Sequence, residues 1–79
     1  MQVLLYSRPG CHLCDEARDV IEGERARTGF ELVEVDVETD DALELAYGIR
    51  IPVVLIDGEE RFEISVDPAA FAAAVARRL

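Results

Sequence analysis

The first half of the chain alternates between two apolar, strand-sized segments and one segment with helical periodicity, and no other feature constrains the fold as much. Residues 2–6 and 30–37 are rich in Val and Leu, and residues 12–27 lie between them. This middle segment repeats apolar side chains at the spacing of one helix face, at Leu13, Ala17, Val20 and Ile21. A strand, a helix and a second strand predict a right-handed crossover between parallel neighbours. We therefore expect an α/β fold.

The second half predicts a short helix followed by a hairpin. The expected helix covers residues 40–47, and the expected strands cover residues 52–56 and 61–65. Asp57-Gly58 between those strands is a strong signal for a tight hairpin, so the two strands should be antiparallel neighbours.

A closing helix completes the predicted architecture. It begins at Asp67-Pro68, with Asp as the cap and Pro in the first turn. Its apolar face is formed by Phe71, Val75 and Leu79. The complete order is βαβαββα, which predicts a four-stranded mixed sheet flanked by three helices. We expect a single domain spanning residues 1–79.

The composition excludes several classes of protein. Seventeen acidic residues against eight arginines give a net charge of −9, and a surface of that sign repels nucleic acid. The longest apolar runs have strand length, so we expect no membrane span. Without a basic and apolar leader, and with only two cysteines, we expect a monomer in the reducing cytoplasm. The acidity favours solubility, and its second interpretation is a preference for basic protein partners.

The segment Cys11-His12-Leu13-Cys14 is a CxxC motif that contains both cysteines of the chain. It lies where the first strand meets the first helix. Cys11 is therefore expected at the helix N-terminus, where unpaired backbone N–H groups stabilise a thiolate. Cys14, one turn further along, should be more buried. We expect Cys11 to attack a substrate disulfide and Cys14 to resolve the product.

Two alternatives to redox chemistry remain open. Cys11, His12 and Cys14 could be metal ligands in a zinc or iron–sulfur binding or carrier protein. Zinc generally takes four ligands, so such a site would need two chains or an external thiol. We expect no metal in a single chain. The other alternative is a partner-binding module in which the motif has no redox role and a groove at Ile51-Pro52 binds the partner.

The sequence around the motif resembles a known family. Residues 6–14 read Tyr-Ser-Arg-Pro-Gly-Cys-His-Leu-Cys, and a basic residue, Pro and Gly likewise precede the CxxC of glutaredoxins; here they are Arg8, Pro9 and the glycine after them. Ile51-Pro52 is similar in position to the cis-proline loop of glutaredoxins and thioredoxins. The chain resembles small bacterial glutaredoxin-like proteins, which implies a thioredoxin/glutaredoxin fold over nearly its whole length.

The resemblance also implies a function. It implies a dithiol oxidoreductase that reduces protein or mixed disulfides, takes part in electron transport and cell redox homeostasis, and needs no tightly bound cofactor. Glutathione, as a co-substrate, or a thioredoxin-reductase-type flavoenzyme would return electrons to the pair. The Ile51-Pro52 bond would be cis and lie across from the CxxC, with the Ile51 backbone pairing to an extended substrate segment. A reduction potential of roughly −270 to −200 mV is expected for such a pair.

Several residues depart from the glutaredoxin pattern at positions that bind glutathione. Leu13 stands in place of an aromatic residue and Arg50 in place of a threonine. Residues 64–68 lack the two glycines that let a backbone approach the tripeptide closely. Arg8 could meet a glutathione carboxylate, or it could be an exposed turn residue. Glutathione recognition therefore stays open.

The charges beside the motif act in opposite directions. A protonated His12 would favour the thiolate, whereas an exposed His12 at the start of a helix would have little effect. Asp15 and Glu16 would repel a thiolate, and Arg8 and Arg50 would offset them. We take His12, Arg8 and Arg50 as candidate tuning residues.

Overall fold

The computed structural model describes residues 1–78 and confirms the predicted order of strands and helices. The elements are β1 (Gln2–Ser7), α1 (His12–Thr28), β2 (Glu31–Asp36), the 3₁₀-helix η1 (Val37–Thr39), α2 (Asp41–Tyr47), β3 (Val53–Ile56), β4 (Glu59–Glu63) and α3 (Pro68–Arg78). The strands form one sheet in the order β2-β1-β3-β4. β1 and β2 are parallel, whereas the β1–β3 and β3–β4 pairs are antiparallel. This mixed sheet confirms the α/β class.

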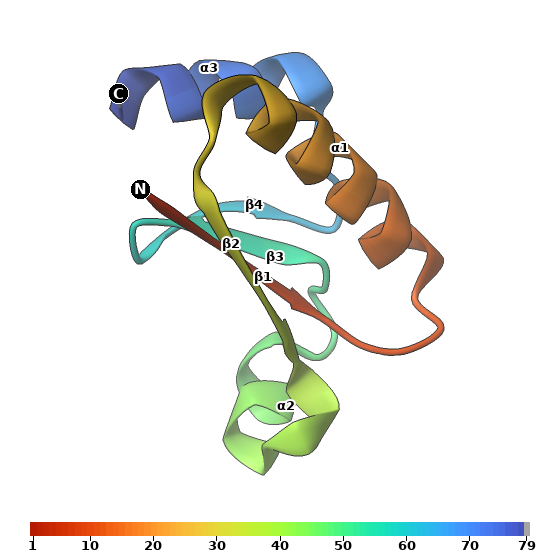
Figure 1. The fold of residues 1–79 in the computed structure, drawn as a ribbon. Helices are drawn as coiled ribbons and strands as arrows, with labels where there is room; N and C mark the ends of the chain where they lie inside the picture. The colour runs from red at the N-terminus through yellow and green to blue at the C-terminus, as the bar shows by residue number, and fades with distance from the viewer. Residues whose placement is uncertain (79) are drawn as a thin grey trace.

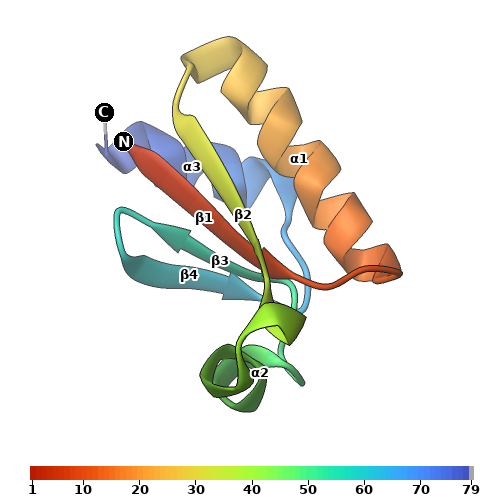
Figure 2. The same cartoon turned by 60° about the horizontal axis from the view of Figure 1, so that its bottom comes forward.

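Helices α1 and α3 cover one face of the sheet, and α2 lies away from them, beyond the carboxyl end of β2 (Figure 1). The same arrangement is visible from a second direction in Figure 2. The core between the two helices and the sheet consists of Val3, Leu5, Ala17, Ile21, Phe30, Val54, Ile56, Val66, Phe71, Ala74 and Val75. Phe71 is fully buried, and its ring lies 6.0 Å from that of Phe30 and 5.9 Å from that of Phe62, centroid to centroid. Burial of such a side chain stabilises the fold by about 2–3 kcal/mol.

Local sequence sets both ends of α1. Cys11 is the N-terminal cap, with extended backbone angles, and its side chain accepts a hydrogen bond from the Cys14 N–H. At the other end Gly29 adopts the left-handed conformation, with φ of 70°, and its N–H donates to the Arg25 carbonyl. Glycine is favoured there because it has no Cβ to clash in that conformation. The helix therefore begins at the CxxC motif itself.

The predicted fourth strand was misplaced by two residues. β4 covers Glu59–Glu63 and not residues 61–65, because Asp57 and Gly58 form a two-residue turn and Ile56 pairs directly with Glu59. Ile64, with φ of 70°, ends the strand. Because the turn has only two residues, the strand begins and ends two residues earlier than predicted.

The buried stripe of α1 differs slightly from the predicted one. Cys14, Ala17, Ile21 and Glu24 face the core, whereas Leu13 is 45% exposed. The buried residues follow the three-to-four spacing of one helix face, starting from Cys14. Leu13 precedes Cys14 by one residue, so it is rotated by about 100° around the helix axis from that face. On α3 the prediction for Phe71 and Val75 is confirmed, and Leu79 lies outside the described residues. Within residues 1–78 no helix is both long and apolar enough to cross a bilayer.

Candidate functional site

The two cysteines meet at the start of α1. They are joined by a disulfide, with Cα atoms 5.2 Å apart. The Cys11 Sγ also accepts a hydrogen bond of 3.1 Å from the Cys14 N–H, and the Asp15 N–H donates to the Cys11 carbonyl at 3.1 Å. Cys14 is completely buried, whereas Cys11 is partly exposed. Cys11 is therefore the more exposed member of the pair, and the Cys14 N–H that bonds to its sulfur is placed to stabilise a thiolate there.

The Ile51-Pro52 segment lies at the same edge of the sheet. Its peptide bond is cis, in agreement with the expectation from the family resemblance. Val53, the next residue, pairs with Tyr6 of β1, one residue before the end of that strand, from which the loop to Cys11 leaves. The Ile64 N–H donates to the Pro52 carbonyl at 2.9 Å and closes this edge. Pro52 is buried and Ile51 is half-buried.

Arg8 points toward α2 and not along the loop to the cysteines. One Nη atom donates to the Glu44 carboxylate at 2.9 Å and to the Gly48 carbonyl at 2.8 Å. The other Nη lies 3.8 Å from the Glu38 carboxylate. Its guanidinium is therefore engaged within the chain and is not a free turn residue.

Arg50 also forms ion pairs within the chain, with carboxylates of β4. Its guanidinium donates to the Glu60 carboxylate at 2.7 and 3.3 Å and to that of Glu63 at 3.1 Å. It also lies over the ring of Tyr47, 5.3 Å from the centroid. Its two carboxylate partners raise the pKa of Arg50 above its usual value, and Arg50 in turn lowers the pKa of Glu60. The Arg50 side chain thus points toward β4.

The remaining predicted residues surround the motif. The His12 side chain is 88% exposed, and its Nε2 lies 3.5 Å from the Glu16 carboxylate. Pro9 is exposed in the turn before Cys11. Leu13 helps to line an apolar hollow of about 250 Å³ between α1 and the start of α3, together with Glu16, Ala17, Val20, Ser65, Val66 and Pro68. Val66 is itself part of the core.

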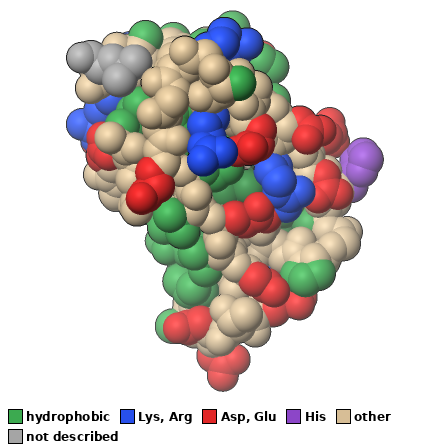
Figure 3. All heavy atoms as spheres, in the orientation of Figure 1, with side chains coloured by type: hydrophobic (Ala, Val, Ile, Leu, Met, Phe, Trp, Pro, Cys, Tyr) green, Lys and Arg blue, Asp and Glu red, His purple; other side chains and the backbone are tan. Residues whose placement is uncertain are grey.

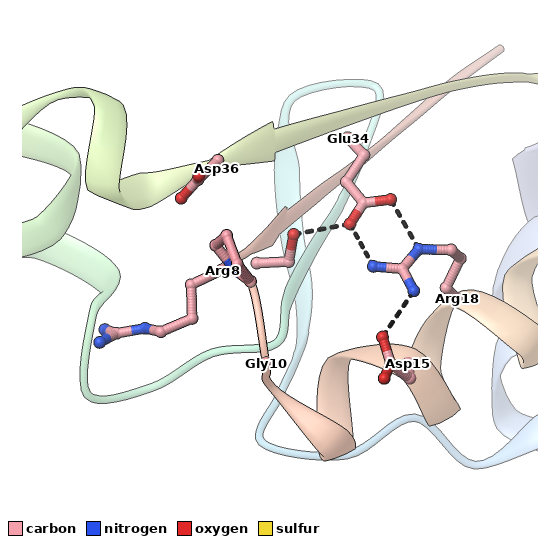
Figure 4. Close-up of a pocket in the computed structure, with 8 residues that line it drawn as sticks. Arg8, Gly10, Asp15, Arg18, Glu34 and Asp36 are labelled. Carbon is pink, nitrogen blue, oxygen red and sulfur yellow. Dashed lines mark hydrogen bonds and ion pairs between the residues drawn. The ribbon is translucent and has the colours of Figure 1, made fainter.

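An ion-pair network beside the CxxC loop was missed by the sequence reasoning. Figure 4 shows Arg18 between Glu34 of β2 and Asp15 of α1. Arg18 bonds to Asp15 at 2.7 Å and pairs with Glu34 through two N–H groups, while the Ser7 hydroxyl donates to Glu34 at 2.7 Å. These groups line a hollow of about 360 Å³ together with Arg8, Pro9, Gly10 and Asp36.

The electrostatics of Glu34 follow from these partners. The hydrogen bonds from Arg18 lower the pKa of Glu34, burial partly opposes them, and the bond from Ser7 adds to the lowering. The available sequence signal was Glu34 itself, a charged residue between Val33 and Val35. Its partner on α1 could not be read from spacing, because it depends on how the helix packs on the sheet.

The described residues contain no group of three or more His, Cys, Asp or Glu side chains placed to hold a metal ion. The motif itself brings together two cysteine side chains, of which Cys11 is partly exposed and Cys14 is buried.

Comparison with known proteins gives consistent results. The profile of the family described as "Glutaredoxin-like domain (DUF836)" matches residues 2–76. The uncharacterized proteins Rv0508 of Mycobacterium tuberculosis and Mb0520 of Mycobacterium bovis are each 32% identical to this chain, covering 96% of it and 84% of their own length.

Solved structures show the same relationship. The X-ray structure of protein XcR50 from X. campestris has a TM-score of 0.81 and 31% identity, covering 95% of this chain and 96% of that one. A mutant thioredoxin from Halobacterium salinarum has a TM-score of 0.68 and 26% identity, covering 96% of this chain and 72% of that one. The thioredoxin fold implied by the sequence resemblance is thereby confirmed.

Proposed function

This chain belongs to the glutaredoxin-like domain family, and from that premise we propose that it is a dithiol oxidoreductase that reduces protein or mixed disulfides. The observation that carries the proposal is the unequal burial of the cysteine pair at the N-terminus of α1, with Cys11 reachable and Cys14 enclosed. No tightly bound cofactor takes part in the reaction, because the two thiols supply both electrons.

The exchange proceeds in two balanced steps. The Cys11 thiolate attacks one sulfur of the substrate disulfide, the substrate S–S bond breaks, and the first substrate thiolate leaves and takes up a proton. Cys14 then loses its proton and attacks the Cys11 sulfur. The mixed disulfide breaks, the second substrate thiol leaves, and the Cys11–Cys14 disulfide forms. The substrate gains two electrons and the protein loses two.

The assignment of roles is tested by trapping. Cys14→Ser should accumulate a mixed disulfide on Cys11 when it is mixed with hydroxyethyl disulfide, because no second thiol can release it. Cys11→Ser is the matched control, and it should accumulate little adduct because Cys14 is buried. Intact-mass spectrometry after an acid quench measures both. Equal adduct formation by the two variants would contradict the roles.

Two electron donors are compatible with this chemistry, and we propose that the protein works in the reducing cytoplasm with one of them. NADPH consumption distinguishes the two. One reaction supplies glutathione and its reductase, the other supplies a thioredoxin-reductase-type flavoenzyme, and both contain hydroxyethyl disulfide as the terminal electron acceptor. The Cys11→Ser variant gives the background rate in each. The donor that supports a rate above that background is the one that recharges the pair.

A further inference from the structure

Three arginines lie near the CxxC edge of the molecule, and each is shared between two carboxylates. Arg8 lies between Glu38 and Glu44, at 3.8 and 2.9 Å. It is three residues from Cys11, in the loop that leads to the motif. One positive charge facing two negative charges leaves this group with a net negative charge.

The second group lies on the helix side of the motif. Arg18 pairs with Asp15 at 2.7 Å and also with Glu34. Asp15 follows Cys14 directly in the sequence. This arginine too is outnumbered by its two acidic partners.

The third group lies beside Ile51-Pro52. Arg50 pairs with Glu60 at 2.7 Å and with Glu63 at 3.1 Å. Glu63 pairs across the sheet with Val53, in the same row as Tyr6 of β1, so the group stands at the edge from which the CxxC loop leaves.

Elsewhere within residues 1–78 the pairing is one to one. Four further arginines each have a single carboxylate partner, in the pairs Arg25–Glu22, Arg27–Glu24, Arg61–Glu59 and Arg78–Asp57. Among these ion-paired groups, carboxylates therefore outnumber arginines only in the three groups around the motif. Figure 3 shows acidic side chains next to basic ones over much of one face of the molecule.

The hollow between α1 and the start of α3, next to the motif, also carries a negative charge. Among its lining residues, which include Leu13 of the motif, the ionisable side chain is Glu16. Its partner His12 lies 3.5 Å from that carboxylate and its side chain is 88% exposed, so solvent screens this pairing. An anion that approaches Cys11 is thus repelled by carboxylates, and the nearby arginines are already paired with carboxylates of the chain.

We infer that the redox pair reacts preferentially with disulfides that carry positive charge, such as those flanked by lysine or arginine in a protein, and that it disfavours anionic disulfides such as that of glutathione. The inference rests on the proposed function. Its cause is long-range: a negative field around Cys11 raises the local concentration of cations and lowers that of anions. This charge preference restricts the class of substrate, which the CxxC motif alone does not specify.

Three small disulfides that differ in charge test the inference: cystamine is dicationic, hydroxyethyl disulfide is neutral and dithiodipropionate is dianionic. The fully reduced protein is mixed with each, quenched with acid and alkylated, and the fraction of oxidised Cys11–Cys14 is followed by mass. Each rate constant is divided by that of dithiothreitol with the same disulfide, which removes differences in intrinsic reactivity. The charge preference is the normalised cystamine rate divided by the normalised dithiodipropionate rate.

We expect a charge preference of at least about tenfold at low ionic strength, within the range that electrostatic focusing produces. It should fall toward one between about 0.01 M and about 1 M salt, because the Debye length shrinks from ~30 to ~3 Å.

A pair of matched double variants locates the source of the field. Glu60→Gln with Glu63→Gln frees Arg50 from both partners, and the charge preference should fall by at least about threefold. Glu22→Gln with Glu31→Gln makes the same change in net charge away from the motif, where Glu22 lies in the last two turns of α1 and pairs with Arg25, and Glu31 pairs across the sheet with Gln2. This control should keep the preference within about twofold.

The outcomes separate this inference from the proposed function. Equal normalised rates for all three disulfides, with the neutral one reduced, would overturn the inference and leave the oxidoreductase intact. An equal loss of preference in both double variants would also overturn it, because the source would then be the net charge of the whole molecule. Failure to react with any disulfide, including the neutral one, would overturn both.

Discussion

Glu34 connects strand β2 to helix α1 through Arg18, and to the end of β1 through Ser7. Its side chain is about one-third exposed, so its ion pair with Arg18 is only partly screened by solvent. The lowered pKa of Glu34 means that the folded state favours the ionised carboxylate. A group whose pKa is lowered on folding contributes stability above its unfolded pKa and loses it as the pH falls through the folded value.

We therefore predict that Glu34→Gln lowers the free energy of unfolding by about 1 kcal/mol at pH 7. The difference from the wild type should begin to shrink below a pH of about 4.3, the usual pKa of an unfolded glutamate, and should be lost below the pKa in the folded state. Urea denaturation at a series of pH values measures it.

Glu31→Gln is the control for this effect. Glu31 lies on the same strand, is exposed and accepts a hydrogen bond from the Gln2 side chain. Its substitution should change the free energy of unfolding by less than about 0.5 kcal/mol, as is usual for an exposed position. A Glu34→Gln deficit that stays the same at low pH would show that the effect is not due to the ionised carboxylate.

The helix α2 is attached to the molecule by few contacts. None of its residues is buried. Tyr47, its last residue, stacks on Tyr6 of β1 with ring centroids 4.3 Å apart. Arg8 reaches across to Glu44 and to the carbonyl of Gly48, just past the helix end. The positive guanidinium there also complements the negative end of the helix dipole.

We predict that Arg8→Gln loosens this helix without unfolding the protein. Loss of a charged hydrogen bond at the helix end should make the Gly48 and Arg50 amides exchange with solvent about tenfold faster, which corresponds to ~1.4 kcal/mol. These amides donate to Glu44 and Tyr47, at 2.8 Å each. Hydrogen exchange followed by NMR measures each amide separately.

The matched change Arg61→Gln removes an arginine that pairs with Glu59 on β4, at 3.2 Å. It should leave the α2 amides unchanged. Unaltered exchange at Gly48 in the Arg8→Gln variant would show that the stacking of Tyr47 on Tyr6 holds the helix by itself.

The order of the elements could be predicted because it depends on local patterns. Periodicity identified α1, the Asp57-Gly58 turn identified the hairpin, and the crossover rule made β1 and β2 parallel. Strand ends were less accurate, since β4 begins directly after the turn. That offset comes from backbone conformation at single residues, including the positive φ of Ile64, and not from hydrophobic pattern.

The partners of the site arginines could not be predicted. Arg8 and Glu44 are 36 positions apart in the sequence, and they meet because α2 folds back beyond the carboxyl end of β2. Arg50 and Glu60 meet because the hairpin brings β4 alongside the segment before β3. By contrast, the cysteines and Ile51-Pro52 carry motifs that are recognisable without any partner.

At the scale of the whole molecule, one edge of the sheet combines the cysteine pair, the Ile51-Pro52 segment and three shared arginines. Six carboxylates share three arginines at this edge, so these groups account for three of the nine net negative charges of the chain. Fold, family and site chemistry all support thiol–disulfide exchange, and the distribution of charge supports a selective form of it. The central claim is that the pair is redox-active and does not serve as a structural crosslink.

The reduction potential of the Cys11–Cys14 disulfide tests this claim most directly. The protein is equilibrated with dithiothreitol buffers of known ratio, quenched with acid and alkylated, and its oxidised fraction is measured by mass. We predict a potential between roughly −270 and −200 mV, the range of thioredoxins and glutaredoxins. A potential below about −300 mV, typical of structural disulfides, would contradict the account.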